Sequence, residues 1–322
     1  MIQSEKRIFK KQVNHMAWGL ILYTILVFGI VVLDMLVKAS VVIWNGNVAD
    51  EAEEIKVLDE VLAKAVESGS SSIVAVVVGV LILYVYFRKT AAPKELFEKK
   101  NIMKPKIFGQ FLCVFMAIQF FALVAGDLME KGFNIFGYSI VSSLETASGD
   151  AETISMFFYV ALLGPVAEEL VYRGFVLQTL KKNGKVFAIV ASSILFGVMH
   201  ANLPQSLFAF MVGLVLGYVA MEYSIWWSIL LHVLNNGVFG CLLSMALSGF
   251  GEKTQECVEL FIMVVFFIVG VIVLWKKRKE IKDYIQTYRT EKIKYAYAFT
   301  TIGMILFIVV QMLMAVSDVE RL

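Results

Sequence analysis

The sequence predicts an all-α fold, a polytopic membrane helical bundle of about eight or nine transmembrane helices. Two observations lead to this fold class. The 322-residue chain is 59% hydrophobic and has a mean hydropathy of +0.76, which is more apolar than a soluble protein of this length usually is. The apolar residues also gather in long runs, and such runs must be helical in lipid because their backbone groups have no water to bind.

Each apolar run is tested against the length that a bilayer requires, roughly 20 residues with about 17–25 as the usual range. Some runs are short, but nine are candidate spans: 16–37, 72–87, 107–125, 153–180, 186–200, 205–221, 225–245, 257–275 and 296–315. Pro165 is expected to kink the fourth span. The first span follows a basic start and is expected to be a retained anchor rather than a signal peptide.

The lysines and arginines predict the orientation of these spans. With the N-terminus inside, the predicted inner segments carry 22 of the 29 Lys and Arg residues and the outer segments carry six. Because cytoplasmic loops are enriched in Lys and Arg, we expect a multi-pass protein of the cell membrane with a cytoplasmic N-terminus and an outer C-terminus. The basic inner run 276–295 is expected to lie against anionic headgroups. Topology accounts for the basic residues, and no nucleic-acid-binding motif is present.

The first outer loop is acidic and contains the segment ADEAEEIKVLDEVLAKAVES, residues 49–68. Its apolar residues recur near helical spacing, at Ile55, Leu58, Leu62 and Val66. This spacing predicts an amphipathic helix that lies over the outer face of the membrane.

Three charged residues interrupt the fourth span, in the stretch PVAEELVYRGF at 165–175. A charge near the bilayer centre costs about 2.5–3.5 kcal/mol on insertion scales, so each charge needs compensation. Glu169 and Arg173 are four residues apart on one helix face and are predicted to form a supporting ion pair. Glu168 points about 100° away around the helix, and its unpaired carboxylate is the functional candidate.

Further polar residues are expected to converge on Glu168. His200 and His232 lie in apolar spans, and Asn236 is one helical turn from His232, whereas Asn235 points elsewhere. Glu168 and His200 each lie 16 residues from the glycine of the predicted inner turn KKNGK, so both are roughly 24 Å from that turn. Side chains from three helices are therefore predicted to meet in an intramembrane polar cavity.

These residues fall in three motifs: EELVYR fits the pattern ExxxR preceded by a second Glu, FGVMH fits FxxxH, and HVLNN fits HxxxN. Together and in this order they resemble the CPBP family, which comprises CAAX prenyl endopeptidases and bacteriocin-processing or immunity proteins and is also called the Abi family. The resemblance covers about residues 153–245. It divides the chain into N-terminal helices with the acidic loop at 1–152, the CPBP-like core at 153–245, and C-terminal helices with the basic segment at 246–322.

The resemblance implies an intramembrane endopeptidase that hydrolyses a peptide bond of a membrane-associated peptide or protein. In that family pattern Glu168 would activate a water molecule, and His200 would help to hold it. His232 and Asn236 would donate hydrogen bonds to the developing oxyanion. Oxyanion donors in a dry site are each worth about 2.7–4 kcal/mol.

The residues leave metal dependence open. Glu168, His200 and His232 would form a zinc ligand set with one free position. The family is described both as metalloproteases and as glutamate-dependent, metal-independent proteases. The sequence thus specifies no cofactor, with Zn²⁺ as the alternative.

Other protease chemistries fit the sequence less well. It contains neither the HExxH of zincins nor a GxSxG elbow. Asp127 and Asp150 fall in predicted outer loops, which argues against a paired-aspartate intramembrane protease. The three cysteines, Cys113, Cys241 and Cys257, show no CxxC spacing and are interpreted as apolar filler.

Two readings without proteolysis remain. One is a protein of the same fold that gives self-immunity to a bacteriocin or acts as a membrane scaffold. The other is a transporter or proton relay, since Glu and His inside a membrane also serve those functions. No inverted repeat of broken helices is visible, which weakens the transporter reading.

Overall fold

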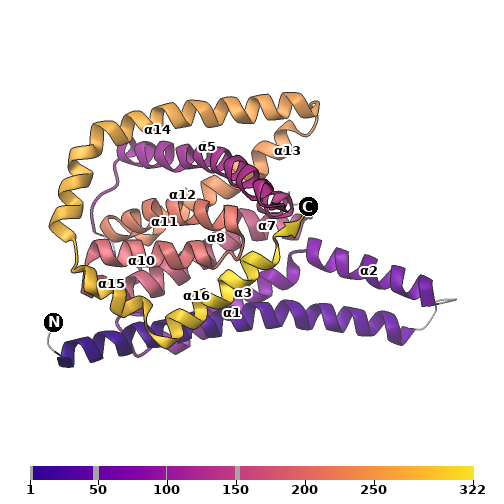
Figure 1. The fold of residues 1–322 in the computed structure, drawn as a ribbon, viewed down its shortest axis with the longest axis horizontal. Coiled ribbons are helices and arrows are strands. Elements are labelled where there is room, and N and C mark those ends of the chain that lie inside the picture. Colours follow the sequence, from indigo (N-terminus) through magenta and orange to yellow (C-terminus); the bar gives the residue numbers. More distant parts are fainter. Residues whose placement is uncertain (1–2, 46–50, 99, 149–152) are drawn as a thin grey trace.

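The computed structural model describes residues 3–45, 51–98, 100–148 and 153–322, and it confirms the predicted all-α membrane bundle (Figure 1). Seven helical segments among the described residues are long and apolar enough to cross a membrane. An eighth results if α15 and α16, which meet at a 73° bend, count as one span. The remaining predicted segment, 186–200, is the shorter apolar helix α10. All nine predicted segments are therefore helical.

The elements follow one another along the chain with short connections. Their bounds are α1 Gln3–Asn45, α2 Glu51–Glu67, α3 Ser70–Phe87, α4 Ala92–Glu95, α5 Pro105–Ile135, β1 Tyr138–Ser139, α6 Val141–Ser148, α7 Ile154–Phe158, η1 Tyr159–Leu163, α8 Gly164–Glu169, η2 Leu170–Val176, α9 Leu177–Leu180, η3 Lys181–Asn183, α10 Lys185–Val198, α11 Leu203–Glu222, α12 Ile225–Val233, η4 Leu234–Leu242, α13 Leu243–Leu247, α14 Glu252–Tyr288, α15 Lys292–Phe299, α16 Ile302–Ser317 and β2 Glu320–Arg321. The segments η1, η2 and η4 are π-helical.

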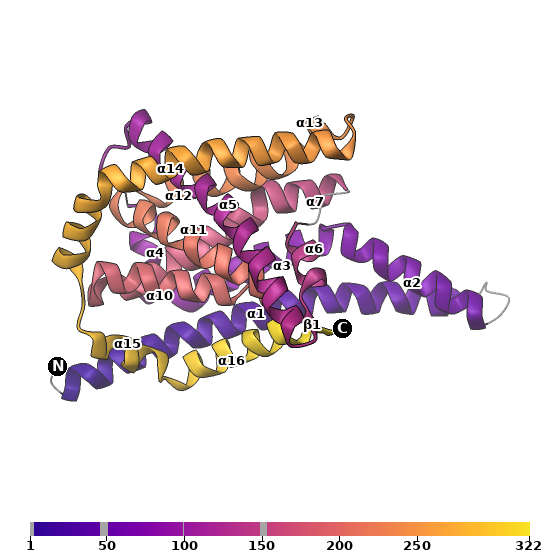
Figure 2. The same ribbon diagram turned by 45° about the horizontal axis from the view of Figure 1, so that its top comes forward.

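The middle of the bundle is formed by the segments that contain the three motifs. Helices α8, α10, α11 and α12 lie at the centre, with α5 and α14 on one side and α1, α3 and α16 on the other (Figures 1 and 2). Helix α14 packs mainly along α5, and α1 packs along α3 and α16. The motif-bearing helices are thus enclosed by flanking helices that precede and follow them in the chain.

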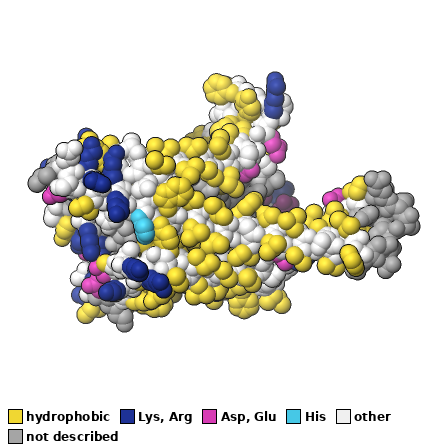
Figure 3. Space-filling view, turned by 90° about the horizontal axis from the view of Figure 1, so that it is seen from below, with side chains coloured by type: hydrophobic (Ala, Val, Ile, Leu, Met, Phe, Trp, Pro, Cys, Tyr) yellow, Lys and Arg dark blue, Asp and Glu magenta, His cyan; other side chains and the backbone are white. Residues whose placement is uncertain are grey.

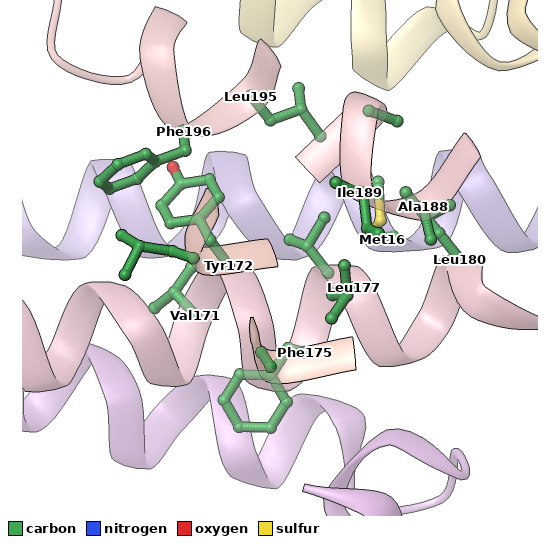
Figure 4. Packing of buried hydrophobic residues seen from close by; sticks show 14 of the residues in the cluster. Met16, Val171, Tyr172, Phe175, Leu177, Leu180, Ala188, Ile189, Leu195 and Phe196 are labelled. Carbon is green, nitrogen blue, oxygen red and sulfur yellow. The ribbon is translucent and has the colours of Figure 1, made fainter. Parts of the chain in front are cut away.

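The central helices pack through buried apolar and aromatic side chains. Figure 4 shows Tyr172 of η2 against Phe196 of α10, with ring centroids 5.4 Å apart. Helices α10 and α11 approach closely because small residues line their contact. A Cβ on Gly197 would lie 2.6 Å from the Ser206 carbonyl oxygen, and one on Gly213 would lie 3.1 Å from the Ser193 Cβ. Small residues allow such close approach between membrane helices.

The span Ile154–Asn183 passes through Pro165 without breaking. A proline lacks the N–H that the helix ladder uses and its ring crowds the preceding turn. The π-helical segment η1 ends directly before α8, whose second residue is Pro165. The wider π-helical turn accommodates the proline, so the sequence around Pro165 distorts the backbone ladder within one continuous span.

Helix α1 is much longer than the predicted span 16–37. Its 43 residues extend roughly 65 Å, about twice the thickness of a hydrocarbon core. The second half of α1 projects from the bundle, and α2 runs back along it (Figures 1 and 2).

The predicted amphipathic helix of the first outer loop is present as α2. Leu58 and Leu62 are half-buried and Ala65 is buried, while Asp59 and Glu60 are exposed. Ile55, which was predicted to belong to the apolar face, is exposed as well, so the buried face begins one turn later. The side chain of Val66 lies outside the described residues. Helix α2 packs on α1, and the expectation that α2 lies over the outer face of the membrane stays a prediction.

Helix α5 also continues beyond its predicted span 107–125 and ends at Ile135. Asp127 is therefore helical and not in a loop, and it forms an i,i+4 ion pair with Lys131 at 2.6 Å. Such pairs stabilise a helix end in water, which explains why the helix continues beyond its apolar run. Asp150 lies outside the described residues.

The chain termini lie at opposite ends of the bundle (Figure 1). At the N-terminal end, Lys294 and Thr290 donate hydrogen bonds to the carbonyl oxygen of Asn183, the residue before the KKNGK glycine. At the other end, β2 near the C-terminus pairs antiparallel with β1, with Tyr138 opposite Arg321. The sequence did not predict this small pair of strands.

Basic side chains gather at one end of the molecule, and a broad hydrophobic band follows them (Figure 3). This distribution agrees with the sequence count and supports the predicted sidedness of the loops. The orientation itself is an expectation that labelling can test.

We expect a cysteine at position 64 on α2 to be labelled from outside the cell and a cysteine at position 279 on α14 from the cytoplasm only. Both Lys64 and Lys279 are exposed, and the positive-inside rule places them on opposite sides. Lys64→Cys and Lys279→Cys would each be made in a background without Cys113, Cys241 and Cys257. Labelling of intact cells with a membrane-impermeant maleimide measures accessibility, and the reverse pattern contradicts the topology.

Candidate active site

The predicted ion pair between Glu169 and Arg173 forms at the centre of the bundle. Arg173 Nη1 lies 3.1 Å from Glu169 Oε1, and both side chains are 0% exposed. Arg173 Nη2 also donates to the Gly213 carbonyl oxygen at 3.3 Å, and its guanidinium stacks 4.2 Å from the Phe196 ring centroid. The arginine is thus compensated by a charge, a carbonyl dipole and an aromatic face.

Glu169 also receives two hydrogen bonds from α12. The hydroxyl of Ser228 donates to Glu169 Oε2, and it lies 3.1 Å from the Leu216 carbonyl oxygen. His232 Nδ1 lies 3.1 Å from Glu169 Oε1. Because an ionised carboxylate can only accept, Nδ1 carries a proton and Nε2 faces the other way. Glu169 therefore orients His232, a role that the sequence did not predict.

Glu168 differs from its neighbour in both burial and partners. Its side chain is 23% exposed, and Oε2 lies 3.7 Å from His232 Nε2. His232 consequently stands between the two glutamates, with Nδ1 toward Glu169 and Nε2 toward Glu168. The partial exposure of Glu168 is what a group that reacts with water needs. The enclosing polar cavity predicted from the sequence stays a prediction.

His200 follows the C-terminal end of α10, next to the same cluster. Its Nδ1 lies 2.8 Å from the Phe196 carbonyl oxygen, so Nδ1 donates and Nε2 keeps its lone pair. The Phe196 ring contacts both histidines edge-on, with its centroid 5.0 Å from the His200 ring and 5.9 Å from the His232 ring. The polar residues of the first two motifs and His232 are therefore brought together.

The turn that carries His200 is held by helices outside the motifs. Gln311 of α16 donates to the Met199 carbonyl oxygen at 3.0 Å. Ala201 adopts a φ of 49°, which is uncommon for a residue with a side chain. Asn202 then accepts from the Gln205 N–H at the start of α11 and donates to the Ser143 carbonyl oxygen at 2.8 Å. These bonds keep the loop conformation that aims His200 at the cluster.

Asn236 lies one turn from His232 on η4, as predicted. Its Nδ2 donates to the Val160 carbonyl oxygen of η1 at 3.4 Å. Asn235 does not simply point elsewhere: its Nδ2 donates to Asn236 Oδ1 at 2.8 Å, and its own Oδ1 accepts from Gln119 Nε2 of α5 at 2.6 Å. The Asn236 side chain is thus held by two hydrogen bonds, one to the backbone of η1 and one from the Asn235 side chain.

The site coincides with all three π-helical segments of the described chain. Segment η2 contains Arg173, η4 contains Asn235 and Asn236, and η1 packs against η4. Gly237 permits this contact, because a Cβ there would lie 3.2 Å from the Ala161 carbonyl oxygen. π-Helical turns are rare and frequently occur at functional sites, so their clustering here is an independent indication of function.

The proposed zinc ligands are not assembled as a set of three. In the described ranges, no group of three or more His, Cys, Asp or Glu side chains is spaced to hold a metal ion. Glu168 and His232 approach one another, and Glu169 behind His232 resembles the carboxylate that often supports a metal-binding histidine. A third protein ligand, which zinc sites generally have, is missing from this geometry.

Sequence reasoning missed two polar residues of the site. Ser228 lies four residues before His232 on the same face of α12, so the i,i+4 rule that paired Glu169 with Arg173 could have found it. Gln119 is one of two glutamines in the apolar run 107–125, and an amide near the middle of such a run is itself a signal, because it needs a partner in lipid.

Comparison with known proteins agrees with the site. Residues 150–238 match the model of the family described as Type II CAAX prenyl endopeptidase Rce1-like. This part of the chain is therefore a CAAX prenyl endopeptidase-like segment. The match contains all three motifs and confirms the resemblance predicted from them. Outside this segment lie α1 to α6 and α13 to α16.

Two relatives among curated proteins extend the comparison. UPF0177 protein YvdC of Lactococcus lactis subsp. lactis strain IL1403 is 27% identical over 179 residues, which cover 52% of this chain and 67% of YvdC. "Putative membrane peptidase YdiL" of Bacillus subtilis strain 168 is 30% identical over 83 residues, 25% of this chain and 34% of YdiL. No solved structure matches the chain. Together with the apolar helices, these findings identify an integral, multi-pass membrane protein with a membrane-protease-like segment.

We expect Arg173→Ala to lower the free energy of unfolding by about 3–5 kcal/mol, because it leaves the Glu169 carboxylate buried without its counter-charge. Thermal unfolding in detergent, followed by the yield of folded protein, measures the effect. Lys131→Ala is the matched control, since it also breaks an i,i+4 pair, but one whose side chains are 68% and 58% exposed. Exposed pairs contribute little. Equal behaviour of the two variants would contradict a stabilising role for the buried pair.

Proposed function

We propose that the chain is an intramembrane endopeptidase that hydrolyses a peptide bond of a membrane-associated peptide or protein. The single observation that carries the proposal is the difference between the adjacent glutamates. Glu169 is fully buried and bound to three side chains, whereas Glu168 is partly exposed and faces His232 Nε2. Only Glu168 is left with the freedom to take up and release a proton.

In this proposal Glu168 acts as the general base. It takes a proton from a water molecule that His200 helps to hold, and the hydroxide attacks the peptide carbonyl carbon. A tetrahedral intermediate forms, and its collapse breaks the C–N bond while Glu168 returns the proton to the leaving amine. A positioned base of this kind contributes about 10²–10⁴-fold to the rate.

His232 and Asn236 would stabilise the oxyanion of the intermediate. Because His232 Nδ1 is already engaged with Glu169, Nε2 can donate to an oxyanion only when the ring carries both protons. The Glu169 carboxylate compensates that charge, because Glu168 is neutral while it holds the proton taken from water. The Asn236 amide needs no change of protonation, since its NH₂ group is a donor in its neutral form.

The substrate class rests on the membrane position of the site and on the family resemblance. We expect a membrane-associated peptide, such as a leader or pheromone precursor, to be cleaved by the purified protein in lipid. A pair of fluorogenic peptides that differ only in a C-terminal farnesylated CAAX motif distinguishes this substrate from the prenylated one that the family description names.

We expect Glu168→Gln to abolish cleavage and leave the protein folded, because the amide keeps the size of the side chain but cannot act as a base. The loss should be about 10²–10⁴-fold in kcat. Glu169→Gln is the matched neighbour and should lower the melting temperature first, since it removes the charge opposite Arg173. Cleavage assays and thermal shift on both purified variants decide. Cleavage at the wild-type rate by Glu168→Gln would refute the assignment of Glu168 as the general base and favour an immunity or scaffold role.

We expect activity to persist in metal-free protein, because Asn236 suits an oxyanion site and the described residues assemble no three-ligand group. Elemental analysis of the purified protein, with cleavage assayed before and after chelation, measures this. Stoichiometric zinc, together with activity that chelation removes and Zn²⁺ restores, would establish instead the zinc mechanism with Glu168, His200 and His232 as ligands.

A further inference from the structure

Three amide side chains form a directed chain of hydrogen bonds that ends at Asn236. Gln119 Nε2 donates to Asn235 Oδ1 at 2.6 Å, and Asn235 Nδ2 donates to Asn236 Oδ1 at 2.8 Å. Asn236 Nδ2 then donates to the Val160 carbonyl oxygen at 3.4 Å. Each amide accepts at its oxygen and donates from its nitrogen, so the three share one direction.

The direction matters because the two ends of an amide are chemically opposite. An Asn236 rotated by 180° would present its carbonyl oxygen, an acceptor, where an oxyanion needs a donor. Asn235 prevents this rotation by placing an N–H against Asn236 Oδ1. Gln119 in turn holds Asn235, because its N–H group requires an oxygen on the facing side.

Burial makes the three amides behave as one unit. Asn235 is only 5% exposed, and Gln119 and Asn236 are half-buried within membrane-spanning segments. An amide that turned alone would face oxygen with oxygen or N–H with N–H, and an unsatisfied polar group is costly away from water. Reversal of one amide would therefore break its bond to the next, and reversal of Asn236 would also place its oxygen against the Val160 carbonyl oxygen.

We propose that Gln119 is a positioning residue that determines, through Asn235, which end of the Asn236 amide faces the substrate. This rests on the proposed function, in which Asn236 donates to the oxyanion. Gln119 lies on α5, outside the family-like segment 150–238, so a flanking helix completes the site. Within the segment the Val160 carbonyl oxygen favours this orientation of Asn236 through a 3.4 Å contact, and Gln119 reinforces it from the opposite side through Asn235.

Two substitutions of Gln119 test the proposal by kinetics. In Gln119→Glu the new carboxylate can only accept, so Asn235 turns to donate to it and places its own oxygen against Asn236 Oδ1. That repulsion displaces the Asn236 amide from its present position. In Gln119→Met the donor is removed without a charge, which keeps the test valid if the charged variant does not fold. Both should lower kcat with KM unchanged. The oxyanion forms only after the substrate has bound, so a residue that acts on the oxyanion affects the chemical step and not substrate binding.

The expected loss in kcat is about 10-fold or more, and no larger than the loss in Asn236→Ala, about 10²–10³-fold. Gln110→Met is the matched control, since Gln110 lies on the same helix and is equally half-buried. It should keep wild-type kcat. The assay uses the fluorogenic peptide that the wild-type protein cleaves, and variants are compared at equal folded concentration.

The double variant shows whether Gln119 acts through Asn236. In the Asn236→Ala background, Gln119→Met should cause no further loss, because the residue that it positions is gone. An additive loss would overturn the proposal. Wild-type kcat in Asn236→Ala would refute the oxyanion role itself, whereas an impaired Asn236→Ala with unimpaired Gln119 variants would refute only the positioning by Gln119.

A measurement without substrate gives an independent answer. In protein labelled with ¹⁵N-asparagine and held in detergent micelles, the side-chain amide signal of Asn236 is identified by its loss in Asn236→Ala. We expect this signal to shift in Gln119→Met and to stay in place in Gln110→Met. An Asn236 signal that does not move in Gln119→Met would overturn the proposal whatever happens to the activity.

Discussion

The buried ion pair between Glu169 and Arg173 is the interaction on which the rest of the site depends. Two charges inside a bilayer are tolerated only when they compensate one another and are further bound. Here Arg173 stacks on Phe196 of α10, and Glu169 accepts from Ser228 and His232 of α12. A single charged pair thereby joins the helices that carry all three motifs, and it orients a histidine of the site at the same time.

The same pair explains why two identical side chains next to one another have different properties. Glu169 uses its charge on Arg173 and its oxygens on α12, whereas Glu168, turned about 100° away, stays partly exposed opposite His232 Nε2. The surrounding backbone supports this arrangement. The π-helical segments η1 and η4 pack against one another here, and they widen the helices around Pro165 and the Asn235–Asn236 pair.

Flanking helices contribute to the site although no motif identifies them. Gln119 of α5 binds Asn235, and Gln311 of α16 binds the backbone of Met199 next to His200. Each is an amide in an apolar helix, where an unpaired polar group would be costly, so each bond also holds its helix against the central bundle. Such contacts give helices outside the family-like segment a direct physical influence on the geometry of the reactive residues.

The sequence by itself determined the helical segments, their charge asymmetry and the pairing of Glu169 with Arg173. Bilayer length, backbone hydrogen bonding and i,i+4 spacing are local properties, so a single segment is enough to predict each of them. Only the tertiary structure decided that His232 binds Glu169 and that Gln119 binds Asn235, because each contact joins residues far apart in the chain. It also decided where the helices end. Helix α1 extends past its predicted span, and α2 packs along it. The sequence of α1 alone does not show that α2 is its partner.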